Sequence, residues 1–136
     1  MTSVLVRHAS AGDRDDWVGD DRQRPLDARG RRQAAELVEL LGGLDVRRVV
    51  SSPYARCVET VEPLAAALGL PVEHDERLAE GMGRAALELL REDGVVSCTH
   101  GDVVGDLLGY GLKKGAAVVL ENGEAVRAIA VPKRKS

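Results

Sequence analysis

The hydrophobic pattern of this chain alternates between short apolar runs and longer amphipathic stretches. Apolar and β-branched side chains dominate residues 3–6, 46–50 and 94–98. Runs of that length and content are typical of buried strands. A brief run at residues 72–74 predicts a further, shorter strand. The first run stops at Arg7-His8, so we expect these two side chains at the carboxyl edge of a sheet.

Helical periodicity fills most of the sequence between these runs. Apolar positions recur at helical spacing after Asp27, and Gly42 is expected to end that helix. Ser52 is expected to cap a second helix that Pro53 opens and Gly69 stops. In total the pattern predicts helices over residues 27–41, 53–68, 82–92 and 102–108.

The order of these elements predicts an α/β fold. Strands and helices alternate to residue 108, and residues 116–120 and 125–131 form a predicted hairpin across Asn122-Gly123. This order favours a three-layer α/β/α sandwich with a mainly parallel central sheet and an antiparallel C-terminal end. A chain of 136 residues fits one domain, residues 1–136, with a basic tail at 132–136 that we expect to be flexible.

Composition narrows the class of protein. Hydrophobic residues make up 44% and charged residues 30%, the balance of a soluble globular protein, while 2% aromatic content leaves the core to aliphatic side chains. No apolar stretch approaches the roughly 20 residues that cross a bilayer, so no membrane partner and a cytoplasmic location are expected. A net charge of -3 argues against a nucleic-acid partner. The oligomeric state stays undetermined.

Chemically distinctive side chains follow three of the predicted strands. Arg7 and His8 follow the first, Arg56 lies in the first turn of the helix after the second, and His100 follows the strand at 94–98. Ligands of open α/β sheets bind at the carboxyl ends of the strands, where these side chains should meet. Two guanidinium groups, two imidazoles and nearby helix N-termini favour an anion, and a phosphoryl group fits best.

Short motifs carry a resemblance to a known family. Residues 6–9 (VRHA), 51–60 (SSPYARCVET) and 98–104 (CTHGDVV) resemble, in order, the boxes of the histidine phosphatase superfamily, with Ala9 replacing a glycine. Residues 24–30 (RPLDARG) resemble a stretch of its small SixA-type phosphohistidine phosphatases, and residues 77–81 (RLAEG) look like its acid-bearing segment. The resemblance implies a phosphoglycerate mutase-like fold.

The resemblance also implies roles for individual residues. His8 would be the nucleophile, Arg7, Arg56 and His100 would hold the phosphoryl group, and Glu80 would be the proton donor. Arg24 either reaches the phosphate from the long loop or pairs with its neighbours. In-line attack by an imidazole needs no metal, and no cofactor is implied.

Other site chemistries find less support in the sequence. Cys57 and Cys98 lack CxxC spacing and are expected to be reduced and structural, and no cysteine-phosphatase CX5R loop or phosphate-binding GxxxxGK[ST] loop occurs. His74 matches no box and is expected to be exposed or on an edge strand. Ser10 and Arg14 are supported only by their place in the loop at residues 9–25.

Three functions are compatible with these sequence features. Only about 20 residues separate Glu80 from His100, too few for a large cap over the substrate. An open pocket favours a SixA-like phosphatase of protein phosphohistidine. The alternatives are a small-molecule or nucleotide phosphatase, and a non-catalytic regulatory module that binds phosphate. In each case the partner is a phosphorylated molecule.

Overall fold

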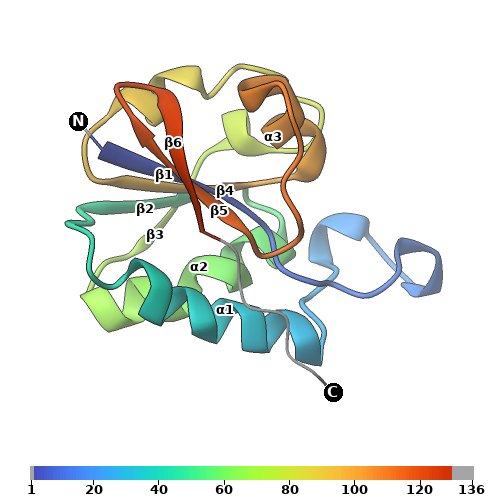
Figure 1. The fold of residues 1–136 in the computed structure, drawn as a ribbon. Helices are drawn as coiled ribbons and strands as arrows, with labels where there is room; N and C mark the ends of the chain where they lie inside the picture. The colour runs from blue at the N-terminus through green and yellow to red at the C-terminus, as the bar shows by residue number, and fades with distance from the viewer. Residues whose placement is uncertain (1, 130–136) are drawn as a thin grey trace.

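Six strands form one sheet in the computed structural model, which describes residues 2–129 (Figure 1). The strands are β1 (Thr2–Arg7), β2 (Arg48–Ser51), β3 (Val72–His74), β4 (Val95–Thr99), β5 (Ala117–Glu121) and β6 (Glu124–Ile129). They are ordered β3-β2-β4-β1-β5-β6. The first four in that order pair in parallel, whereas β5 and β6 are antiparallel to their neighbours. The predicted sheet, with its antiparallel C-terminal end, is therefore confirmed.

Helices cover both faces of this sheet (Figure 1). Helices α1 (Ala28–Leu41) and α2 (Ala55–Leu68) lie on one face, and α3 (Gly101–Leu108) lies on the other with a short 3-10 helix (Leu87–Arg91). Further 3-10 turns occur at Arg14–Asp16, Asp21–Gln23 and Glu76–Leu78. The three-layer α/β/α arrangement agrees with the prediction. None of the helices within residues 2–129 is long and apolar enough to cross a membrane.

The alternation of side chains along β1 divides the core between the two helical layers. Val4 and Val6 pack in one cluster with Leu37 of α1 and Leu64 of α2. Leu5 points the other way, into a second cluster that includes Val103, Val104 and Leu107 of α3. Successive strand residues face opposite sides of a sheet, so a strand buried on both faces reads as the continuous apolar run found at residues 3–6.

Two predicted helices differ from the observed ones. Helix α2 begins at Ala55 with Tyr54 as its N-cap, two residues after the predicted start. The Ser52 hydroxyl accepts from the amide of Tyr54 at 3.3 Å, one residue before the helix, and also contacts Nε2 of His100 at 2.9 Å. The predicted helix at 82–92 is wrong apart from the 3-10 turn at its end. Gly81 and Gly83 adopt left-handed φ values of 82° and 59°, which interrupts a right-handed helix at its expected start.

The C-terminal hairpin forms as predicted within the described residues. Asn122 and Gly123 adopt φ values of 55° and 83°, the left-handed conformations that an Asn-Gly hairpin turn requires. The second strand is described to Ile129, so the last two residues of the predicted strand and the predicted flexible tail at 132–136 lie outside the described residues.

Parallel pairing sets three strand ends side by side. Arg7 of β1 pairs in register with Thr99 of β4, and Ser51 of β2 pairs with Cys98. The segments that follow these strands therefore emerge together at one edge of the sheet.

Candidate active site

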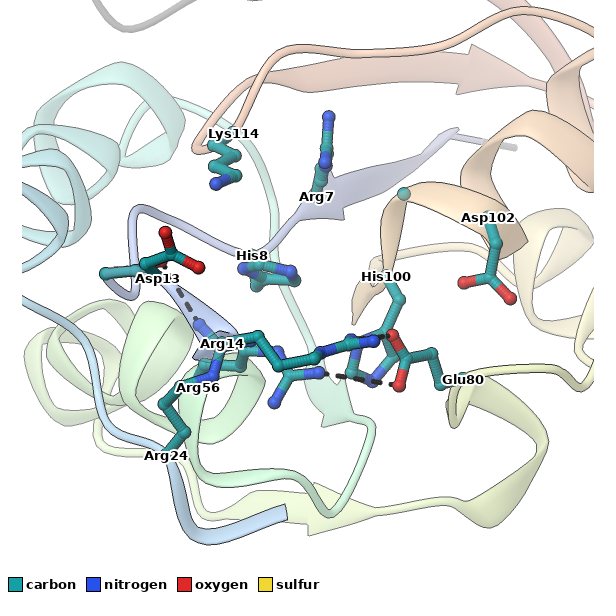
Figure 2. Close-up of a pocket in the computed structure, with 12 residues that line it drawn as sticks. Arg7, His8, Asp13, Arg14, Arg24, Arg56, Glu80, His100, Asp102 and Lys114 are labelled. Atoms are coloured by element: carbon teal, nitrogen blue, oxygen red, sulfur yellow. Dashed lines mark hydrogen bonds and ion pairs between the residues drawn. The ribbon is translucent and has the colours of Figure 1, made fainter. Parts of the chain in front are cut away.

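A pocket of about 640 Å³ lies at this sheet edge (Figure 2). Its walls come from the ends of β1 and β4, the start of α2, the loop at residues 9–25, and the turns near residues 80 and 114. All the site residues proposed from the sequence line it: Arg7, His8, Arg24, Arg56, Glu80 and His100. Six further residues complete the lining: Gly12, Asp13, Arg14, Gly101, Asp102 and Lys114.

His8 is buried at the floor of the pocket, with 7% of its surface exposed. Its Nδ1 lies 2.8 Å from the carbonyl oxygen of Ala9. A carbonyl oxygen only accepts hydrogen bonds, so Nδ1 carries the proton and Nε2 has the free lone pair. The pKa of His8 is lowered to about 3, chiefly by burial and also by electrostatic interaction with His100, Arg56 and Arg7, which together outweigh the opposing hydrogen bond to Ala9. The imidazole is therefore neutral and nucleophilic at neutral pH.

Three buried nitrogen atoms around this pocket have no hydrogen-bond partner among residues 2–129. They are Nε of Arg7, Nε of Arg56 and Nδ1 of His100. A buried polar group without a partner costs on the order of 1–3 kcal/mol, and more for a charged group. Since all three belong to residues that line the same pocket, an oxyanion with several acceptor oxygens would satisfy them together.

The surrounding structure holds each of these groups in place. Arg7 donates from Nη1 to the carbonyl of Leu112 at 2.7 Å. The ring of His100 contacts the Ser52 hydroxyl through Nε2 and packs edge-on against Tyr54, with ring centroids 4.5 Å apart. These contacts fix the donors before a ligand arrives, which is the arrangement that electrostatic catalysis requires.

Arg56 is almost completely buried and is linked to two carboxylates. Its guanidinium donates to the backbone and side chain of Asp21, at 2.8 and 3.1 Å, and lies 3.6 Å from Glu80. Burial alone would raise the pKa of Asp21, but Arg24, Arg56 and Arg14 together lower it. Asp21 thus stays ionised and compensates part of the buried positive charge.

Glu80 forms its shortest contact with Arg14, at 2.7 Å from Nη2 (Figure 2). Arg14 also lies 3.5 Å from Asp21, which closes a ring of four charged groups with Arg56. This ring joins the loop at residues 9–25 to the turn around residue 80. Sequence reasoning gave Arg14 no role beyond its position, because a contact across 66 residues leaves no local pattern.

Arg24 lines the pocket but uses its hydrogen bonds on the long loop. Its Nη1 donates to the carbonyls of Ala11 and Gly12, at 2.6 and 3.3 Å, and its Nε donates to Asp21 at 3.0 Å. These bonds correspond to the second of the two alternatives for Arg24, pairing with its neighbours. A contact from Arg24 to the phosphate stays a prediction.

The remaining histidine and the two cysteines do not line the pocket. His74 is exposed on edge strand β3 and does not line the pocket. Cys57 and Cys98 are buried and not joined to each other by a disulfide. Within residues 2–129, no group of three or more His, Cys, Asp or Glu side chains is arranged to hold a metal ion.

Comparison with known proteins identifies the family. Residues 3–86 match the model of the histidine phosphatase superfamily (branch 1). The chain therefore belongs to this superfamily.

Individual relatives refine the comparison. The chain is 34% identical over 150 residues to an 8-oxo-(d)GTP phosphatase of Mycolicibacterium smegmatis, an alignment that covers 93% of this chain and 47% of the relative. The chain thus spans about half the length of that protein. Among solved structures it is similar to the protein histidine phosphatase SixA complexed with tungstate, with 24% identity, a TM-score of 0.72, and coverage of 96% of this chain and 97% of the other. A putative SixA from Agrobacterium tumefaciens has 19% identity, a TM-score of 0.73 and the same coverage.

Proposed function

We propose that this chain is a phosphatase that transfers a phosphoryl group to His8 and then to water. The observation that carries the proposal is the neutral, buried imidazole of His8 in a pocket with three unpartnered nitrogens. Arg7, Arg56 and His100 would donate to the phosphoryl oxygens, and the two guanidinium groups would offset their charge. Each of these three nitrogen atoms would then have an acceptor.

The chemistry proceeds in two steps on these side chains. Nε2 of His8 attacks phosphorus in line, and the bond between phosphorus and the leaving group breaks with its electron pair going to the leaving atom. Glu80, held at the pocket by Arg14, would protonate that atom. As a carboxylate, Glu80 would then remove a proton from water, whose oxygen attacks phosphorus and returns the electron pair of the N–P bond to His8. The products are inorganic phosphate and the dephosphorylated substrate.

Two substrate classes have separate support. The short connection between Glu80 and His100 leaves the pocket open, which favours protein phosphohistidine, and the similar SixA structures match this chain over nearly their whole length. The relative from Mycolicibacterium smegmatis is named as an 8-oxo-(d)GTP phosphatase, which favours a nucleotide. A regulatory module that only binds phosphate has less support, because binding does not require a neutral nucleophile among the donors.

The proposal is tested by trapping the phosphorylated enzyme. Incubation of the wild-type protein with a labelled phosphoryl donor should place an acid-labile, base-stable label on His8. The His8→Ala variant should take up no label and should hydrolyse p-nitrophenyl phosphate at the rate of a blank. Retention of turnover in a folded His8→Ala variant would refute the mechanism.

A further inference from the structure

Lys114 is a positively charged residue that lines the pocket and has no role in the proposed phosphoryl transfer. It is exposed, lines the same pocket as His8, and its side chain extends toward that pocket in Figure 2. It comes from the turn before β5, about 100 residues from His8 in sequence. Neither the motifs nor the helical and strand patterns drew attention to it.

The turn that carries Lys114 is anchored on the backbone of the proposed nucleophile. The amide of Gly115 donates to the carbonyls of both Arg7 and His8, at 3.1 and 3.0 Å. The amide of Ala116 donates to the backbone carbonyl of Lys113 at 2.9 Å. Gly115 has a φ of 79°, as the third residue of a type II turn over residues 113–116 requires. The Cα of Lys114 is therefore held at a defined position beside His8, which separates it from an ordinary surface lysine.

Lys114 also differs from the other cations of the pocket in its electrostatic partners. Arg14, Arg24 and Arg56 each form an ion pair with Asp21 or Glu80. Lys114 forms no ion pair with any carboxylate among residues 2–129, and it acts on Asp27 only at longer range. Arg7 has no carboxylate partner in the described part of the chain either, but its unpartnered Nε is assigned to the phosphoryl group being transferred.

We propose that Lys114 binds a second anionic group of the substrate, and that this group is a further phosphate. The inference rests on the proposed function and selects between its two substrate classes. The transferred phosphoryl group would occupy Arg7, Arg56 and His100, which leaves Lys114 for a neighbouring charge. When the substrate is phosphohistidine, the leaving group is an imidazole without a negative charge. When the substrate is a phosphoanhydride, the leaving group ends in a second, negatively charged phosphate.

The substrate class is then a phosphoanhydride such as a nucleoside diphosphate. Nε2 of His8 bonds to the terminal phosphorus, and the bond from that phosphorus to the bridging oxygen breaks. The electron pair stays on the bridging oxygen, so that the leaving group ends in a phosphate whose added charge Lys114 stabilises. Water then hydrolyses the phosphohistidine. The net reaction consumes one water and releases inorganic phosphate and a substrate shortened by one phosphate.

The test compares ADP, which carries a second phosphate, with p-nitrophenyl phosphate, which has only one. The value of kcat/KM is measured for ADP and for p-nitrophenyl phosphate with the wild-type protein, Lys114→Met and Lys113→Met. Lys113 is the matched control because it is exposed on the same turn and does not line the pocket. Loss of one charge-assisted hydrogen bond predicts a decrease of about tenfold for ADP in Lys114→Met. The values for p-nitrophenyl phosphate should stay within about twofold, and Lys113→Met should leave both substrates unchanged.

The outcomes separate this inference from the function on which it rests. An equal decrease for both substrates in Lys114→Met, no decrease for ADP, or a wild-type protein that hydrolyses p-nitrophenyl phosphate but not ADP would overturn the second phosphate site. Each of these results leaves the phosphatase itself intact. Turnover of p-nitrophenyl phosphate by His8→Ala would instead overturn the proposed function. Lys114→Arg should retain most of the activity on ADP, since it keeps the charge.

Discussion

Between about pH 3 and pH 6.5, His8 is neutral in the folded chain but positively charged in the unfolded chain. An unfolded histidine has a pKa near 6.5, whereas burial and the positive groups nearby lower the pKa of His8 to about 3 in the fold. Between these values the unfolded state binds the extra proton. The stability that neutral His8 contributes is fully present above pH 6.5 and is lost as the pH falls toward 3.

This linkage predicts how stability depends on pH. Between pH 7 and pH 4, the free energy of unfolding of the wild type should fall by on the order of 3 kcal/mol more than that of His8→Asn. Asparagine does not titrate, so the difference isolates His8 from the other ionisable groups. Urea unfolding of both proteins at the two pH values measures it. Parallel decreases would show that His8 titrates normally in the fold.

At the scale of helices and strands, most of the side chains that line the pocket come from the ends of these elements and not from their interiors. Strand β1 delivers Arg7, and α3 begins at Gly101, against which the Arg7 guanidinium packs. A β-carbon at position 101 would lie 2.9 Å from Cζ, Nε and Nη2 of Arg7. The absence of a side chain on the first residue of α3 therefore gives Arg7 its place in the pocket.

A pair of glycine substitutions in α3 tests this packing. Gly101→Ala should fold with a free energy of unfolding within about 1 kcal/mol of the wild type, because the flexible end of Arg7 can move away. Its kcat/KM for p-nitrophenyl phosphate should fall by about tenfold or more as that donor leaves the pocket. Gly105→Ala is the control, since a β-carbon there meets nothing within 4 Å. It should leave activity unchanged and stabilise the helix by up to about 1 kcal/mol. Equal activity in both variants would contradict the role given to Gly101.

At the scale of the whole molecule, the pocket depends on how the loop at residues 9–25 docks on α1. The carbonyl oxygen of Ser10 accepts from Asp27, and the Ser10 hydroxyl donates to the Asp27 carboxylate at 2.8 Å. The backbone of Gly30 lies so close to Ser10 that a β-carbon at position 30 would be 1.9 Å from the Ser10 carbonyl oxygen. Neither backbone segment can yield without moving the loop that carries Arg14 and Arg24.

The docking predicts a large effect from one methyl group. Gly30→Ala should lower the free energy of unfolding by about 2 kcal/mol or more, as overpacking against fixed backbone does, and should lower phosphatase activity by displacing the loop. Gly43→Ala, just after α1, meets nothing within 4 Å and should change stability by less than about 0.5 kcal/mol. Urea unfolding and a p-nitrophenyl phosphate assay measure both effects. Similar stabilities for the two variants would show that the loop is not clamped at Gly30.

The sequence predicts correctly those features that depend on interactions between residues close together in the chain, and it misses features that depend on distant contacts. Strand β4 and helix α1 were placed to within about a residue, because apolar periodicity and flanking caps are local signals. The predicted helix at 82–92 failed because left-handed turns at Gly81 and Gly83 outweighed a weak helical pattern. A local pattern predicts Ser52 at a helix start, where its hydroxyl accepts from the Tyr54 amide, but it does not predict the second contact of that hydroxyl with His100, 48 residues away.

Local patterns in the sequence are enough to predict the α/β order and the strand ends that carry Arg7, His8 and His100. Parallel strands bring their carboxyl ends to one edge, so these side chains are also expected to meet. Which atoms in the pocket lack partners, and which charges are already paired, depends on how distant segments pack in the folded chain. Arg14 meets Glu80 across 66 residues, and Lys114 reaches the pocket through a turn bonded to the backbone of Arg7 and His8. Such contacts arise from the packing of distant segments, which leaves no periodic signal along the chain.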